Sequence, residues 1–158
     1  MKAALVWFRR DLRLADQPAL AEALAGAGTV IPVYVHSPGE EGDWAPGAAS
    51  RWWLHHSLAA LDAALRARGS RLILRRGPAL QALQALAEET GAEAVYWSRL
   101  YEPAAIERDK AVKKALGDAG LDAVSCGGHL LLEPWTVKTG AGDPYRVFTP
   151  FWRACAPK

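Results

Sequence analysis

Hydrophobic positions in the chain form short continuous runs that alternate with stretches of helical periodicity. Five runs have the length and composition of β-strands, at residues 3–8, 29–35, 71–75, 93–98 and 121–125. Four helical patterns separate them, at residues 18–25, 48–68, 78–90 and 103–116. Strands that are apolar throughout are typical of a parallel sheet covered on both faces. The pattern predicts an α/β fold with a three-layer, doubly wound, five-stranded parallel sheet, similar to flavodoxin or Rossmann domains.

Local signals refine three places in this pattern. Asp16 precedes Pro18 and is predicted to cap the first helix, since Pro favours the first helical turn. Pro32 lacks a backbone N–H and predicts a β-bulge or an edge position in the second strand. The loop at residues 37–47 is rich in Gly and Pro and long for a compact domain, which favours a functional role. After Gly127 the regular pattern stops, and we expect an irregular segment over residues 129–158.

Composition limits the classes of function. The 158 residues are 51% hydrophobic and 23% charged, which is typical of one globular domain. The net charge is only +2, so a nucleic-acid role would need a local basic patch. Cys126 and Cys155 have neither metal-ligand spacing nor a disulfide framework, which favours a reducing cytoplasm. The apolar run at residues 3–8 is too short for a signal peptide or membrane span, so no membrane partner is expected.

Several common chemistries have no support in the sequence. There is no Gly-x-Gly-x-x-Gly after the first strand, no Walker loop and no Gly-x-Ser-x-Gly motif. His55 and His56 are adjacent on a predicted helix and therefore point apart, which is poor metal geometry. We expect no catalytic residue and no metal ligand within this chain.

Charged and aromatic residues gather where the predicted strands end. Ligands of open parallel sheets bind outside the carboxyl ends of the strands. Arg10 and Asp11 directly follow the first strand and are the leading ligand candidates, whereas Arg9 is expected to be solvated. Arg13 and Asp16 are expected to pair with each other or with nearby backbone. The sequence therefore predicts a ligand crevice at the strand tips.

Three motifs together resemble the photolyase/cryptochrome family. They are Trp-Phe-Arg-Arg-Asp-Leu-Arg-Leu-Ala-Asp at residues 7–16, Ser-Arg-Trp-Trp-Leu at 50–54, and Tyr-Arg-Val-Phe-Thr-Pro-Phe-Trp at 145–152. The likeness covers essentially the whole chain and is closest to the amino-terminal domain of bacterial cyclobutane pyrimidine dimer photolyases. It implies an antenna domain at residues 1–128 and the start of an interdomain segment at 129–158.

The resemblance also implies what the full-length protein would do. A helical domain, absent from this chain, would hold FAD and the damaged DNA and would be the intramolecular partner of this domain. Such a deoxyribodipyrimidine photo-lyase uses blue or near-ultraviolet light for repair, and this fragment alone would not be catalytic. One alternative is a cryptochrome-like photoreceptor without repair activity. Another is a vestigial crevice in a domain that only supports its helical partner.

The implied antenna chromophore is methenyltetrahydrofolate, with a deazaflavin or FMN as the alternative. Ala104 and Ala105 replace an Asn-Glu pair of one folate-binding branch, whereas residues 52–56 and 133–136 resemble another branch that also takes folate. Trp53 is expected in a core or interdomain position. The chromophore is expected to contact aromatic walls and polar groups at seven positions: Arg10, Asp11, His36, Ser37, Trp52, Tyr101 and Glu102.

Overall fold

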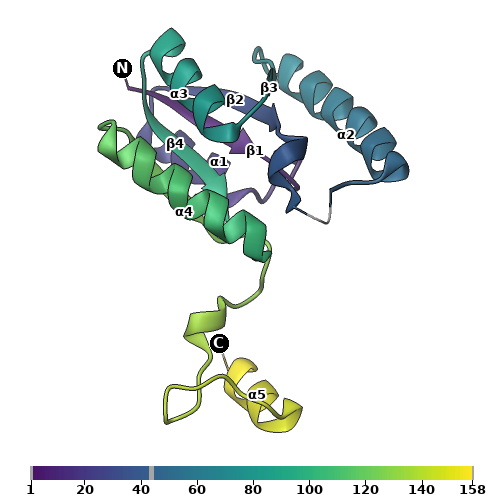
Figure 1. The fold of residues 1–158 in the computed structure, drawn as a ribbon, viewed down its shortest axis with the longest axis vertical. Helices are drawn as coiled ribbons and strands as arrows, with labels where there is room; N and C mark the ends of the chain where they lie inside the picture. The colour runs from purple at the N-terminus through teal and green to yellow at the C-terminus, as the bar shows by residue number, and fades with distance from the viewer. Residues whose placement is uncertain (1, 43–44, 158) are drawn as a thin grey trace.

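The computed structural model describes residues 2–42 and 45–157 and contains a five-stranded parallel sheet (Figure 1). The strands are short and mostly buried, and their order across the sheet is β3-β2-β1-β4-β5. Their bounds are β1 Ala3–Phe8, β2 Thr29–His36, β3 Ile73–Arg76, β4 Ala92–Ser98 and β5 Asp122–Cys126. All neighbouring strands are parallel, which confirms the predicted sheet.

Four helices cover the two faces of the sheet, and each face has its own hydrophobic core. The helices are α1 Pro18–Gly26, α2 Ala48–Arg66, α3 Ala79–Thr90 and α4 Pro103–Asp118. On one face, Leu83 of α3 and Leu116 of α4 pack with strand residues such as Leu5. On the other face, Ala23 of α1 and Leu65 of α2 pack with Val6, Phe8 and their neighbours. Alternate residues of β1 therefore supply the two cores, as the two-residue period of a strand requires.

The strand order locates the point where the winding of the chain reverses. From β1 the chain moves outward through β2 to β3, then crosses back so that β4 pairs with the other side of β1. At their carboxyl ends, the chain therefore leaves β1 toward β2 and leaves β4 in the opposite direction, toward β5. In open α/β sheets this is where ligands bind.

The first helix begins at Pro18, as the sequence pattern predicts, but its N-cap residue differs from the prediction. Gln17, not Asp16, is its N-cap, because the Gln17 side chain accepts a hydrogen bond from the backbone N–H of Leu20. Asp16 is left-handed, with φ of 50°, and its carbonyl oxygen accepts two hydrogen bonds from Arg13. The predicted local pairing of Arg13 is confirmed, and the predicted cap at Asp16 is wrong.

Pro32 is accommodated without a bulge between β1 and β2. Their register is continuous from Ala3 opposite Thr29 to Phe8 opposite Tyr34. The irregularity lies instead between Ala3 and Ala4, where β1 meets β4. β3 pairs with β2 only from Val33 onward, so Pro32 lies where β2 has β1 as its only strand neighbour. Of the two predicted alternatives, a bulge or an edge position, the structure has the edge position at Pro32.

The segment after β5 is more ordered than predicted. It contains a short 3-10 turn, η3 Pro134–Thr136, and a helix, α5 Phe148–Cys155. Pro150 is tolerated because the first N–H groups of a helix have no acceptor within the helix. Phe148 and Trp152 stack one turn apart, with ring centroids 6.2 Å apart, and both are exposed. Figure 1 shows α5, in yellow, lying away from the sheet.

No helix within residues 2–42 and 45–157 is long and apolar enough to cross a membrane.

Candidate functional site

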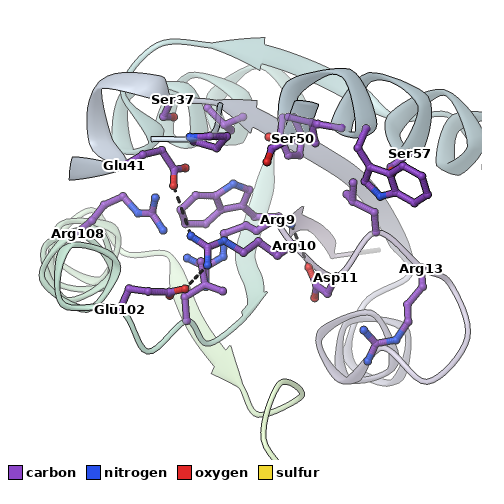
Figure 2. Close-up of a pocket in the computed structure, with 18 of the residues that line it drawn as sticks. Arg9, Arg10, Asp11, Arg13, Ser37, Glu41, Ser50, Ser57, Glu102 and Arg108 are labelled. Carbon is purple, nitrogen blue, oxygen red and sulfur yellow. Dashed lines mark hydrogen bonds and ion pairs between the residues drawn. The ribbon is translucent and has the colours of Figure 1, made fainter. Parts of the chain in front are cut away.

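A cavity of about 850 Å³ opens at the carboxyl ends of β1 and β2 (Figure 2). Its volume lies within the range of about 300–1,000 Å³ that is common for ligand sites. The end of β1, the end of β2 with its following loop, the first half of α2 and the start of α4 all contribute to its lining. The site thus forms on the α2 side of the switch point.

The cavity exists because the first half of α2 stands off the sheet. No side chain of residues 48–57 is buried, whereas Leu61 and Leu65 in the second half lie in the core. The first half contributes Ser50, Trp53 and Ser57 to the cavity wall, at spacings of three and four residues. That spacing places them on one face of the helix.

Arg9 is the buried anchor at the base of the site. One terminal nitrogen of Arg9 donates to both carboxylate oxygens of Asp109, at 2.7 and 2.8 Å, and the other donates to the carbonyl oxygen of Ser98. Burial lowers the pKa of Arg9, and the nearby Asp109 opposes that shift. The prediction of a solvated Arg9 is wrong, because α4 presents an acidic partner that the local sequence does not reveal.

The indole of Trp7 forms part of the cavity floor between two cations. The guanidinium carbons of Arg9 and Arg108 lie 4.7 and 5.3 Å from its ring centroid. Its other neighbour is Trp97, whose ring centroid lies 6.1 Å away. The indole nitrogens of Trp7 and Trp97 are buried with no hydrogen-bond partner in the described part of the chain. Sequence reasoning assigned Trp7 only to the strand, since nothing in an apolar run distinguishes a floor from a core residue.

Arg10 bridges two loops across the cavity. Figure 2 shows its guanidinium between Glu41, from the loop after β2, and Glu102, which caps α4. It forms an ion pair with Glu102 and a longer one, at 3.6 Å, with Glu41. Partial burial raises the pKa of Glu102, but its backbone hydrogen bonds and Arg10 outweigh that effect and lower it. Arg10 is half-exposed, so this pair can exchange partners with a ligand.

Asp11 and Ser37 line the cavity but already hold structural hydrogen bonds. Asp11 is 3% exposed and accepts from the backbone N–H of Arg9 at 3.0 Å and from Gln17 at 2.7 Å. The hydroxyl of Ser37 donates to the carbonyl oxygen of Gly77 at 2.7 Å. These residues therefore shape the site by fixing the turns after β1 and β2.

The structure brings together four of the seven predicted site residues, Arg10, Asp11, Ser37 and Glu102. His36, Trp52 and Tyr101 do not line this cavity. Trp52 is exposed, with its ring 4.3 Å from that of His56. Trp53, expected in a core or interface position, is 69% exposed and lines the cavity instead. The helical spacing of Trp53 from Ser50 and Ser57 is the signal that could have identified it.

The β5 side of the same sheet edge is closed by the chain itself. Arg99 donates to one carboxylate oxygen of Glu133 at 2.7 Å, and the Tyr101 hydroxyl donates to the other at 2.8 Å. The Arg99 guanidinium also lies 5.3 Å from the ring centroid of Trp135. Burial raises the pKa of Tyr101, and its hydrogen bond to Glu133 adds to the effect. A small cavity of about 220 Å³ lies on this side.

The donor set of the large cavity fits a flat polar chromophore. Trp53, Leu54 and Leu100 offer apolar surface, while Arg10, Glu41 and Glu102 offer both charges at one point. A conjugated ring with N–H donors and an anionic tail needs both kinds of partner. Across residues 2–42 and 45–157, no group of three or more His, Cys, Asp or Glu side chains could hold a metal ion.

Comparison with known proteins identifies relatives of this domain. The family model for DNA photolyase matches residues 4–158. The chain is 50% identical over 150 residues to a deoxyribodipyrimidine photo-lyase of Agrobacterium fabrum, covering 95% of this chain and 31% of that protein. It is 43% identical over 155 residues to Cryptochrome-2 of Arabidopsis thaliana, covering 98% of this chain and 25% of that protein.

A solved structure agrees with these sequence relatives. The crystal structure of a bacterial class III photolyase from Agrobacterium tumefaciens superposes with a TM-score of 0.90 at 47% identity, covering 99% of this chain and 32% of that one. The chain thus spans about a third or less of the length of these three relatives. Both the sheet topology and the matched residues lead to one conclusion: the chain belongs to the DNA photolyase family.

Proposed function

We propose that this domain holds a light-absorbing antenna chromophore in the cavity between α2 and the end of β1. The observation that carries the proposal is the open cavity at the strand tips, lined by an indole and by Arg10 with its two carboxylates. The chromophore would absorb near-ultraviolet or blue light and pass the energy to FAD held elsewhere in the full-length protein. In that protein the light energy would drive repair of pyrimidine dimers in DNA.

The residues of this chain would bind and orient the chromophore and would exclude water from it. Trp53 and Leu54 would cover a ring face, and ring stacking is worth about 0.5–1.5 kcal/mol beyond the buried area. Arg10 would pair with an anionic tail, while Glu41 and Glu102 would accept from ring N–H groups. Methenyltetrahydrofolate carries all of these features, and a deazaflavin or FMN is the alternative.

The helical domain would be the intramolecular partner of this domain, and damaged DNA would bind through that domain. Cys126 and Cys155 are both free thiols, which supports the cytoplasm as the compartment of the full-length protein.

A cryptochrome-like photoreceptor is the second candidate, because the chain is 43% identical to Cryptochrome-2 of Arabidopsis thaliana over 98% of its own length. The two functions differ in repair. Full-length protein illuminated with blue light should restore a dimer-containing oligonucleotide if it is a photolyase. Light-dependent flavin reduction with no restored oligonucleotide would favour the photoreceptor.

Reconstitution tests the antenna role directly. Full-length protein is incubated separately with methenyltetrahydrofolate, FMN and a deazaflavin, and bound chromophore is measured by absorbance after gel filtration. Trp53→Ala and Arg10→Gln should each lower the bound fraction. Trp52→Ala is the matched control, since the neighbouring indole lies outside the cavity. Absence of binding by all three chromophores, or equal loss in Trp52→Ala and Trp53→Ala, would contradict the proposal.

A further inference from the structure

One short stretch of the chain concentrates positive charge. Residues 66–76 contain five arginines and no acidic residue, so eleven positions hold five of the 19 basic residues of the chain. They are Arg66, Arg68, Arg71, Arg75 and Arg76. The net charge of the whole chain is only +2, so this stretch is a local feature rather than part of a general excess.

These arginines lie along one open edge of the sheet. β3 is the outer strand in the order β3-β2-β1-β4-β5, and Figure 1 shows it next to the end of α2. Beside it runs a groove of about 560 Å³, lined by Arg66, Arg71 and Arg75. The groove also reaches Val30 to Pro32 of β2, where β3 does not pair. None of the five arginines lines the proposed antenna cavity.

Three of the five arginines are held by partners within the domain. Arg66 pairs with Asp62 at 2.6 Å, and Arg75 pairs with Glu89 at 2.6 Å. Arg68 donates to the carbonyl oxygen of Ala64 at 2.9 Å, as expected near the end of a helix. The side chains of Arg71 and Arg76 are exposed, and neither has a hydrogen bond or ion pair with any residue that the structure describes. Two guanidinium groups are therefore available to an external anion.

Protection of an edge strand does not explain this composition. Charges on an edge strand, lysine in particular, prevent pairing with another sheet, but that role does not require the guanidinium group of arginine. Here every charge in the stretch is positive and every one is an arginine. The planar guanidinium binds phosphate oxygens in pairs, which an ammonium group cannot do. The uniform sign and the residue type favour a phosphate ligand.

We propose that this edge, formed by β3 and the end of α2, binds the phosphate backbone of nucleic acid. At about 3.3 Å per residue, the stretch from Arg71 to Arg76 extends on the order of 15 Å. That length exceeds a single phosphate and matches several consecutive phosphates of one strand. Unpaired backbone N–H groups at a sheet edge add further donors. Such contacts are independent of base sequence and of any lesion.

The test uses full-length protein and a labelled, undamaged oligonucleotide, single-stranded or duplex, titrated at several salt concentrations. The variant Arg71→Glu/Arg76→Glu should bind about tenfold more weakly or worse at low salt. The slope of log affinity against log salt concentration should fall by about 2, because about one counterion is released per phosphate contact. The variant Arg71→Lys/Arg76→Lys should retain most of the slope.

A matched control separates this site from net charge. Lys110→Glu/Lys114→Glu makes the same change in net charge on exposed positions of α4, far from β3 in the strand order. It should leave binding nearly unchanged. The glutamate variants also keep a charged edge, so gel filtration should show the parent's oligomeric state. Arg71→Gln/Arg76→Gln provides a second reading without charge reversal.

Three results would overturn the proposal. Unchanged oligonucleotide binding in both the Glu and the Gln variants would show that the arginines only protect the edge strand from pairing with another sheet. An equal loss of oligonucleotide affinity in the α4 control would show that net charge, and not this edge, determines binding. Weaker binding of inorganic phosphate alone, without weaker oligonucleotide binding, would indicate a small-anion site. Chromophore content is measured on the same samples, and its value bears only on the antenna role.

Discussion

The two sides of the β1–β4 switch point share one sheet edge, but one side is open and the other is closed. On the α2 side the edge opens into a cavity of about 850 Å³, whereas on the β5 side the chain's own Glu133 occupies the corresponding place. Each side carries an arginine shortly after a strand: Arg10 is the second residue after β1, and Arg99 directly follows β4. The difference lies in their carboxylate partners.

Arg99 binds a carboxylate from the segment that follows β5, so the chain closes that side itself. Arg10 is held by Glu102 and, more loosely, by Glu41, and remains half-exposed. A ligand can therefore compete for Arg10 much more easily than for Arg99. The comparison teaches that strand topology defines where a site can form, and a few side chains decide which side stays open.

The largest expected effect, on the free energy of unfolding, comes from breaking the buried ion pair between Arg9 and Asp109. Asp109→Ala leaves Arg9 buried beside Trp7 without its carboxylate partner. Loss of one partner of a buried ion pair costs about 3–5 kcal/mol, so the free energy of unfolding should fall by that amount. Urea unfolding measures it. The double variant Arg9→Met/Asp109→Leu should recover much of the loss, and a loss in Asp109→Ala comparable to that of an exposed ion pair would contradict the buried-anchor interpretation.

The second prediction fills the open side. Ser57 lies on the cavity face of α2 and is only partly buried, so Ser57→Phe should occupy the cavity without entering the core. Bound chromophore should fall about tenfold or more, which corresponds to about 1.4 kcal/mol. The free energy of unfolding should stay within about 0.5 kcal/mol of the parent. Absorbance and urea unfolding test this, with Ser57→Ala as control; full chromophore content in Ser57→Phe would place the ligand elsewhere.

The third prediction opens the closed side. Glu133→Ala removes the acceptor of both Arg99 and Tyr101. The free energy of unfolding should fall by about 1.5–2 kcal/mol, at the lower end of the range for hydrogen bonds to charged groups, because Arg99 and Glu133 are partly exposed. The segment that contains η3 should also become more sensitive to limited proteolysis. Glu107→Ala on exposed α4 is the control, and equal proteolysis of both variants would show that Glu133 does not hold the segment.

The smallest expected effect concerns Tyr101. Its pKa is raised above 10.0, so its contribution to stability is complete below pH 10.0 and is lost as the pH rises through the raised value. Glu133→Gln removes one cause of the shift and should lower the pKa toward 10.0, while burial remains. Ultraviolet titration of tyrosinate, with Tyr101→Phe to assign the signal, measures it. A higher pKa in Glu133→Gln would refute the assigned cause.

Most of the fold could be predicted from the sequence because the strands are apolar throughout. Runs such as Leu5 to Phe8 and Ala94 to Trp97 are covered by helices on both faces, so nearly every position in them is apolar and the strands can be recognised from sequence. The helix α5 was missed because its pattern contains a proline. That proline occupies a first-turn position, where helices tolerate it.

The site could be predicted only in part. Arg10 lies two residues after β1 and Glu102 four residues after β4, so topology alone brings them to the same edge. Asp109, one hundred residues from its partner Arg9, lies on a helix face that no local pattern connects to that partner. The choice between Trp52 and Trp53 depends on the rotation of α2 by one residue, which is decided by the packing of Leu61 and Leu65. The rest of the site therefore could not be predicted, because it depends on contacts between residues distant in sequence and on the rotation of a helix.

The raised first half of α2 has a consequence for protein engineering. Because residues 48–57 contribute no buried side chain, replacements there should cost little folding stability. Libraries that vary this first half of α2, with the second half of the helix kept constant, could be screened for proteins that accept pigments of other colours. The same scaffold would then harvest a different part of the spectrum.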